Sequence, residues 1–494
     1  MIEEYEKNRL VFRRQYIIAP YPIECPFLHH AHKLSGNGFL YTHLDLKVTK
    51  VLSGRKQVIL LGDIFDHDHT EYKNDDILGD IAQHDFPEVL AYASRYSGRF
   101  VIIYLDPATF TIFTDATASR KVYYCYEESK FWCGSQPHLI AKILGYDRTK
   151  NPSMVRFYNS EDFVRLCYSN VGDTTPYDAI KQLIPNHYLS VNQGKPIRFW
   201  PDKQIQIQPL EDVAEKCATI LKGTMEAITA RYEVMLPVTA GYDSRMLMAA
   251  TRTHHEHIFY YLNQERHLTE RHNDIRIPRK IFATLNMDFH VLKLEPKIDK
   301  DFEKIYLFNN PTANKEYLPH IFTYYKWYSH KVNLPGNFAA ATWGINRLKE
   351  EKISAENLAY LYRLSSYDYA LDYNRKWLDE CSEPCFENNV NPITLYYWEE
   401  RIANWGTQIQ LDKDIAQEDI NPLNSRLIIE QFLSVKREYH NAPDHILHKR
   451  IIERLWPQLN NFPYNPGCQR TFLTAMKKAG LLNLVLKIRY KHMR

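Results

Sequence analysis

The sequence predicts two domains in succession: a strand-rich α+β domain, and then an α/β domain that holds a parallel sheet and ends in helices. Short apolar runs broken by turn signals fill residues 58–144, strands alternate with helices over 234–294, and helical patterns dominate from 395 onwards. The length of 494 residues supports two domains, because a single hydrophobic core stops growing beyond roughly 250–300 residues.

The first domain is expected over residues 1–206. Residues 58–63 and 100–105 are apolar enough to be buried strands, and 109–114 alternates as the hairpin partner of the second strand. A helix over 77–95, with apolar residues at helical spacing, interrupts the strand series. These elements predict a layered domain of sheets and helices.

The second domain is expected over residues 207–494. The polar, glutamine-rich stretch 204–209 marks the boundary, and an amphipathic helix over 211–232 follows it. That helix leads into an apolar strand that begins at Val234.

After this first strand, further strands are expected at 258–262, at 289–294 and from Val332, with a helix over 273–285 between the second and the third. Strands that alternate with helices are parallel and are joined by right-handed crossovers. Their carboxyl ends therefore line one edge of the sheet, where such domains bind ligands.

The stretch 234–250 reads as strand, tight loop and helix. Small residues at 239–241 keep side chains out of the turn, while backbone N–H groups and the hydroxyls of Thr239 and Ser244 converge at the start of the helix. Asp243 places a carboxylate among these groups, which suits a divalent cation between it and a phosphate. From the loop alone, phosphate binding and an ordinary strand-to-helix turn are equally good interpretations.

Composition excludes several classes of protein. A net charge of +3 gives no reason to expect a nucleic-acid or membrane partner, and no apolar run approaches the ~20 residues that a membrane span needs. The first six residues, MIEEYE, are acidic and lack an apolar core of a signal peptide, so a cytoplasmic protein is expected.

Several motifs together resemble one family. The loop around Asp243 is similar to the PP-loop pattern Ser-Gly-Gly-x-Asp-Ser, with Thr239 and Ala240 as departures. The segments 62–66, 96–106, 115–124 and 133–136 follow one another as in the glutaminase domain of asparagine synthetase, and they are GDIFD, YSGRFVIIYLD, DATASRKVYY and CGSQ.

The resemblance covers nearly the whole chain in the correct order, so the chain is identified as a member of the asparagine synthetase superfamily. It implies an Ntn-type sandwich of two antiparallel sheets between helices. A PP-loop domain, of the adenine nucleotide alpha hydrolase-like kind and with a helical C-terminal half, is implied after it.

The resemblance also implies ATP and Mg²⁺ as cofactors. Main-chain groups at Tyr261 and Leu262 lie where the family holds adenine, and the turn at Gly336 and Asn337 matches the family's Gly-Glu-x-x-Asp-Glu loop. The implied nucleotide-binding residues are Val238, Thr239, Ala240, Gly241, Asp243, Ser244, Tyr261, Leu262, Gly336 and Asn337. Asp243 is the implied metal ligand, and it stands alone because Ala340 and Ala341 occupy acidic positions of the second loop.

Three residues are candidates for catalysis: Asp243, Glu400 and Lys449. Glu400 and the neighbouring Arg401 match a helix that faces the substrate in the family, although adjacent charges on a long helix also suit a solvated surface. Lys449, followed by a second basic residue, is the nearest counterpart of the family's Arg-x-Lys element, which supplies a cation to developing negative charge.

The glutaminase chemistry of the family needs a cysteine directly after the initiator methionine. This chain has Ile2 there, and no cleavage signal near Cys25 suggests that processing exposes another thiol. The expected function is therefore an ATP-dependent ligase that adenylates a carboxylate, releases AMP and pyrophosphate, and joins the acyl group to an amine or ammonia without hydrolysing glutamine.

A small-molecule, sugar or peptide carboxylate is the expected substrate, in surface-glycan or natural-product biosynthesis. Related proteins without the glutaminase cysteine include beta-lactam synthetases, lasso-peptide cyclases and asparagine synthetase-like proteins of polysaccharide gene clusters. The alternative is a degenerate homologue that binds a nucleotide or a partner protein, favoured by Ile2, by Ala340 and Ala341, and by the lack of a clear lysine element. The oligomeric state stays open, with a homodimer as one option.

Overall fold

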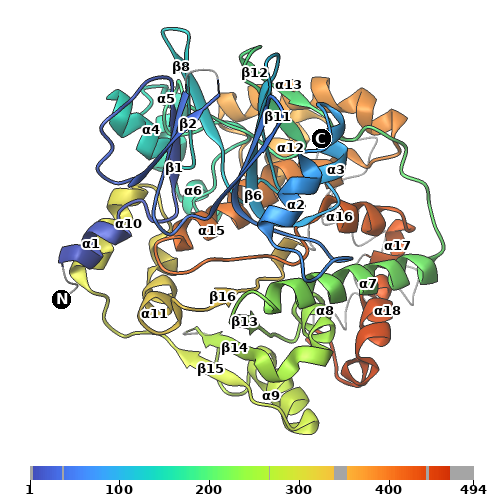
Figure 1. Cartoon of the computed structure of the whole chain (residues 1–494). Helices are drawn as coiled ribbons and strands as arrows, with labels where there is room; N and C mark the ends of the chain where they lie inside the picture. Colours follow the sequence, from blue (N-terminus) through green and yellow to red (C-terminus); the bar gives the residue numbers. More distant parts are fainter. Residues whose placement is uncertain (1–3, 36–37, 266–267, 339–352, 441–443, 468–494) are drawn as a thin grey trace.

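The computed structural model describes residues 4–35, 38–265, 268–338, 353–440 and 444–467. Two packed sheets form the first part of the chain, drawn in the upper part of Figure 1, and a parallel sheet lies below them. A linker then runs down the side of the molecule to a long helix, α7 (Leu210–Thr229), which leads into the parallel sheet. None of the helices in these ranges combines the length and the apolar character that a bilayer crossing requires.

The first part contains two six-stranded sheets whose strands pair antiparallel. One sheet consists of β1 (Tyr16–Ala19), β2 (His30–Leu34), β3 (Gly38–Thr42), β8 (Tyr123–Glu127), β9 (Lys130–Gly134) and β10 (Lys181–Gln182). The other consists of β4 (Val48–Ser53), β5 (Lys56–Phe65), β6 (Ser97–Leu105), β7 (Phe110–Thr114), β11 (His187–Ser190) and β12 (Lys195–Arg198). Their strand orders are β10-β8-β9-β1-β3-β2 and β12-β11-β7-β6-β5-β4.

Alternation along β5 explains how the layers stack. Ile59 and Leu61 point into the core between the two sheets, whereas Val58 and Leu60 point to the other face, against α2 (Asn74–Ile81) and α3 (Glu88–Ala93). On the outer face of the other sheet, α4 (Pro137–Leu144) packs in the same way. The sandwich of two antiparallel sheets between helices, which the family resemblance implies, is present.

One predicted helix is wrong in its extent. The pattern over 77–95 suggests a single helix, but the chain forms α2 and α3 with a break between them. Pro87 lies in that break, immediately before α3, and proline has no N–H for an intrahelical hydrogen bond. The helical spacing of apolar residues therefore continues across two separate helices.

The second part contains four parallel strands, all at predicted positions. They are β13 (Val234–Pro237), β14 (Ile258–Gln264), β15 (His290–Lys293) and β16 (Val332–Asn333), in the order β15-β14-β13-β16. The helices between them are α8 (Tyr242–Ala250), α9 (Asn273–Leu285), α10 (Lys300–Asn309) and α11 (Leu318–Tyr328). The chain moves from β13 outward to β15 and then returns to the opposite side of β13, so the strand order reverses between β13 and β16.

The remaining described residues are largely helical, as expected. The C-terminal helices are α12 (Ala355–Leu361), α13 (Asp368–Glu387), α14 (Pro392–Tyr396), the π-helix η5 (Tyr397–Gly406), α15 (Thr407–Lys413), α16 (Arg426–Leu433), α17 (Arg437–His440) and α18 (Ile446–Leu455). Shorter helices elsewhere are α1 (Glu4–Leu10), α5 (Pro152–Tyr158), α6 (Glu161–Arg165) and the 3₁₀ segments η1 (Arg252–His257), η2 (Lys315–Tyr317) and η6 (Pro457–Asn461).

Buried ion pairs join the sandwich to the C-terminal helices. Arg99, on β6, donates to Asp414 Oδ1 over 2.6 Å and to Glu418 Oε1 over 3.0 Å. Arg120 donates to the same Glu418 oxygen over 2.7 Å. One hydrophobic core also contains residues of both parts, so the two parts share an extensive packed junction.

Candidate functional site

Two loops meet at the carboxyl edge of the parallel sheet, where the strand order reverses. One follows β13 and ends in the first turn of α8, and the other follows β16 and contains Gly336. A Cβ atom placed on Gly336 would lie 3.5 Å from the Cβ of Asp243 and 3.2 Å from the Cδ1 of Leu247. The close approach of these loops puts Asp243 and Gly336 side by side, as the sequence predicts for a ligand crevice.

Three backbone amides of the β13–α8 loop already have hydrogen-bond acceptors. The amide of Thr239 donates to Ser244 Oγ over 3.1 Å, and the amide of Gly241 donates to Thr239 Oγ1 over 3.1 Å. The amide of Ala240 donates to Asp274 Oδ1 over 2.9 Å. The chain thus supplies a carboxylate of its own to a loop whose amides suit an anion.

Asp274 belongs to the first turn of α9, so it comes from the crossover that follows β14. Its side chain is 34% exposed, and its second carboxylate oxygen lies 3.7 Å from His272 Nδ1. An incoming phosphate would compete with this carboxylate for the amide of Ala240. Asp274 could not be found from the sequence, because no pattern within α9 indicates which loop its first turn touches.

Asp243 stands in the first turn of α8. Its Oδ1 atom is buried and accepts no hydrogen bond from the described residues. His448, a fully buried residue of α18, places its Nε2 atom 3.5 Å from this oxygen. Lys449, the catalytic candidate on α18, is the residue next to His448.

Arg245 fixes the C-terminal segment of the described chain against α8. Its buried guanidinium donates to the carbonyl oxygens of Phe462 over 2.9 Å and of Pro463 over 3.0 Å. It also lies 3.9 Å from the ring centroid of Tyr464. Carbonyl groups of a distant segment therefore provide the acceptors of this buried cation.

The same segment covers the loop. The ring of Tyr464 stacks on that of Tyr242, with centroids 4.2 Å apart and an interplanar angle of 1°. Next to it, the amide of Asn465 donates to the carbonyl oxygen of Ala240 over 3.0 Å. Residues 459–465, which we name the C-terminal strap, thereby hold the loop and the start of α8 in place.

The expected adenine region is buried. The carbonyl oxygen of Tyr261 accepts a hydrogen bond of 2.9 Å from the amide of Val238, which extends the β13–β14 pairing by one residue. The hydroxyl of Tyr261 donates to Asn333 Oδ1 over 2.9 Å, and burial holds the pKa of that phenol well above its usual range. Leu262 packs with Leu268 in a small apolar cluster.

The turn after β16 also contacts the helical part. Asn337 Oδ1 accepts a hydrogen bond of 3.1 Å from Asn421, and Gly406 at the end of η5 lies against the same turn. Ala340 and Ala341, at the acidic positions of the family loop, lie outside the described residues.

Glu400 lies in a different environment from the loop. It is 5% exposed, and its Oε2 atom accepts a hydrogen bond of 2.6 Å from the amide of Gly172. Burial raises the pKa of Glu400 to about 8. Arg401 donates to the carbonyl oxygen of Leu166 over 3.0 Å, so this pair packs against the sandwich, and the alternative of a solvated helix face is wrong.

Lys449 is half-buried on α18, and its carbonyl oxygen accepts a hydrogen bond of 3.0 Å from Asn460. Among the described residues, the hydrogen bonds of the Glu400 side chain go to Gly172 and Asn404, and not to the β13–α8 loop. The structure thus brings Asp243, Gly336 and the loop residues together, and it leaves Glu400 apart from them.

The start of the first strand contacts the segment that follows α15. Residue 2 lies outside the described residues, and the first strand of the sandwich begins only at Tyr16. Gln15, just before that strand, is held by Asp414, whose Oδ2 atom accepts a hydrogen bond of 3.0 Å from its side chain. Burial raises the pKa of the Cys25 thiol, which disfavours the reactive thiolate.

No protein-family model matches the chain, and no curated protein matches it. Solved structures give 25 matches. One is the glutamine phosphoribosylpyrophosphate (PRPP) amidotransferase from B. subtilis complexed with ADP and GMP, with 9% identity, coverage of 64% of this chain and 90% of that chain, and a TM-score of 0.23. Another is described as the allosteric regulatory enzyme of purine biosynthesis. It has 10% sequence identity and a TM-score of 0.24, and the match covers 63% of this chain and 76% of that chain. TM-scores this low carry no argument about the chain.

Proposed function

We propose that the parallel-sheet half is a PP-loop domain, and that the chain is an ATP-dependent carbon–nitrogen ligase. It adenylates a carboxylate and passes the acyl group to an amine or ammonia, without hydrolysing glutamine. The main support is the meeting of two loops around Asp243 at the reversal of strand order, which is the place where open parallel sheets bind ligands.

The donor set at this place fits a hard cation. Asp243 Oδ1 is buried and accepts no hydrogen bond from the described residues, and its nearest charged neighbour, His448 Nε2, is 3.5 Å away, so a metal ion would give this oxygen a closer partner. Mg²⁺ is commonly held by one or two carboxylates together with phosphate oxygens and water. When bound, it would neutralise negative charge on the pyrophosphate that leaves.

The protein's own groups would orient the nucleotide. The N-terminus of α8 presents positive potential to the phosphates, and the hydroxyls of Thr239 and Ser244 lie 3.1 Å apart at the same turn. Asp274 would release the amide of Ala240 as a phosphate approaches. Because its side chain is partly exposed, it can turn to solvent with a smaller desolvation change than a buried carboxylate would need.

A second candidate function is nucleotide binding without turnover. Two observations favour it: Asp274 accepts a hydrogen bond from the amide of Ala240 in the loop, and Glu400 accepts one from Gly172 outside the crevice. Under this alternative the chain would act as a sensor or as a partner-binding protein.

Two measurements distinguish these functions. Mg²⁺-dependent binding of ATP is expected under both, and exchange of radiolabelled pyrophosphate into ATP, stimulated by one acid of a carboxylate panel, is expected only of the ligase. Asp243→Asn should abolish the exchange. Binding without exchange across the panel supports the second candidate, whereas no binding of ATP with or without Mg²⁺ refutes both.

A further inference from the structure

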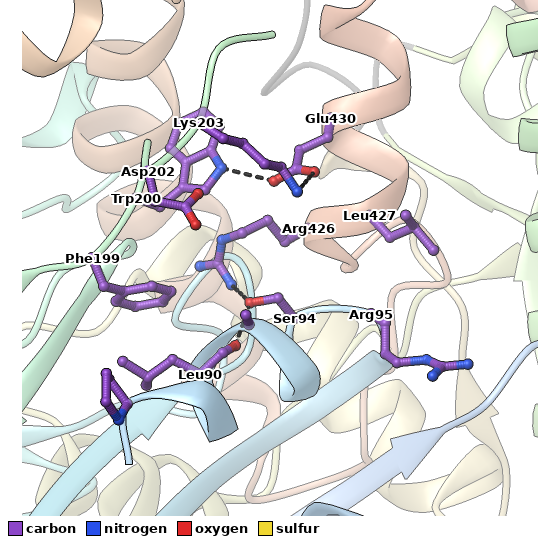
Figure 2. A pocket seen from close by; sticks show the side chains of 12 residues that line it. Leu90, Ser94, Arg95, Phe199, Trp200, Asp202, Lys203, Arg426, Leu427 and Glu430 are labelled. Atoms are coloured by element: carbon purple, nitrogen blue, oxygen red, sulfur yellow. Dashed lines mark hydrogen bonds and ion pairs between the residues drawn. The ribbon is translucent and has the colours of Figure 1, made fainter. Parts of the chain in front are cut away.

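A separate cavity of about 330 Å³ lies at the junction of the two parts of the chain. Figure 2 shows it between α3, the segment 199–203 and α16. None of its lining residues belongs to the β13–α8 loop or to the turn after β16. Small-molecule sites commonly have volumes of ~300–1,000 Å³, so the cavity has room for a small ligand.

Arg426 forms one wall of the cavity and is 5% exposed. Its guanidinium donates to Ser94 Oγ over 2.9 Å and to Asn186 Oδ1 over 3.1 and 3.3 Å. Both acceptors are neutral, and no carboxylate of the described residues lies within ion-pair distance. Carboxylates such as Glu430 act on Arg426 only from beyond ion-pair distance, and a guanidinium has five N–H donors, more than these contacts use.

The two carboxylates near the mouth of the cavity do not pair with Arg426. Glu430 accepts hydrogen bonds from Trp200 Nε1 over 2.9 Å and is paired with Lys203 Nζ at 3.4 Å. Asp202 is exposed. Figure 2 shows the link from Trp200 and Lys203 to Glu430 on one side, and the Arg426 guanidinium directed towards the sandwich on the other. The deep part of the cavity therefore keeps a positive charge.

An apolar surface adjoins this charge. The Phe199 ring centroid lies 4.8 Å from the Arg426 guanidinium carbon, Leu90 lies on the same side of Arg426, and Leu427 lines the cavity on the opposite side (Figure 2). A flat ring can pack on such a surface while an oxyanion on the ring reaches the arginine.

We infer that this cavity binds a small organic anion, a carboxylate or phosphate carried on a ring, whose charge pairs with Arg426 and whose ring packs on the apolar side chains of the lining. Because α3 belongs to the sandwich and α16 to the helical part, the ligand contacts both parts of the chain. The inference does not depend on the function proposed for the β13–α8 loop.

Calorimetric titration of the full chain with benzoate and with phenyl phosphate tests the inference and tells the two oxyanions apart. Benzyl alcohol is the uncharged control and should bind roughly tenfold or more weakly than the better anion, because it cannot form a charge-assisted pair. Arg426→Gln should weaken binding of the anion by a similar factor.

Leu427→Trp provides a second test that leaves the polar contacts of Arg426 in place. The larger side chain fills the cavity and should abolish binding, whereas Leu433→Trp, the same replacement on α16 outside the lining, should leave binding unchanged. If neither anion binds at millimolar concentration, or if Leu427→Trp binds as tightly as the unaltered chain, the inference is wrong.

Discussion

Replacement of Asp274 by asparagine tests whether the β13–α8 loop is a phosphate site. The carboxylate of Asp274 holds the amide of Ala240 over 2.9 Å, and asparagine keeps an acceptor of the same size there without the charge. If phosphate and Asp274 compete for this amide, removal of the charge should strengthen the binding of Mg²⁺-ATP.

The magnitude follows from the geometry. Two unit charges 4 Å apart repel by about 4 kcal/mol at an effective dielectric constant of 20. The Asp274 side chain is 34% exposed, and solvent screens much of this repulsion. We expect a gain of ~1–2 kcal/mol in binding free energy, which is a dissociation constant about 5–30 times lower.

Titration calorimetry with Mg²⁺-ATP on the unaltered chain and on Asp274→Asn measures this change. Asp299→Asn is the matched control, because Asp299 also accepts hydrogen bonds from the backbone at a helix start, that of α10, and asparagine caps helices equally well. If the affinity of Asp274→Asn is unchanged or lower, the amide of Ala240 takes no part in phosphate binding, and the proposed site loses its central donor.

Three further changes have defined outcomes. Asp243→Asn should remove the Mg²⁺ dependence of ATP binding measured by titration, and an unaltered dependence would assign the metal to another residue. Arg245→Met leaves the carbonyl groups of the C-terminal strap without their donor. It should lower the free energy of unfolding, measured by urea denaturation, by about 2–4 kcal/mol. A loss below ~0.5 kcal/mol would contradict the role of Arg245 in holding the C-terminal strap. The pKa of Glu400 is about 8 in the folded chain, against an ordinary value of 4.5, so between these pH values the folded state keeps a proton that the unfolded state has released. The stability that this proton confers is fully present below pH 4.5 and is lost as the pH rises towards 8. The stability of Glu400→Gln relative to the unaltered chain should therefore rise by at least ~1 kcal/mol between pH 4.5 and pH 8 in denaturant titrations, and parallel pH profiles would show that Glu400 titrates normally.

The parallel sheet was predictable because its strands are short apolar runs bounded by turn residues. The sequence predicts α9 over 273–285, and the structure has the same bounds. The first strands of the sandwich were missed. β2 has the sequence HAHKL with exposed residues, and an edge strand of this kind shows neither an apolar run nor a clean alternation.

The site was predictable only where it depends on topology. Asp243 and Gly336 follow neighbouring parallel strands, so their proximity follows from the strand order. Asp274 and His448 reach Asp243 or its loop through the packing of α9 and α18, and no local pattern encodes which side chain of those helices turns inward. The location of Glu400 was missed for the same reason, since adjacent charged residues on a helix do not indicate which face is buried.

The ion pairs of Arg99 and Arg120 with Glu418 have a consequence for how the chain can be divided. Separation of the sandwich from the rest would expose two guanidinium groups and the carboxylates that they neutralise, together with the apolar surface of their shared core. Neither fragment is thus a self-sufficient piece, because the parallel-sheet part and the sandwich complete a shared core at their junction.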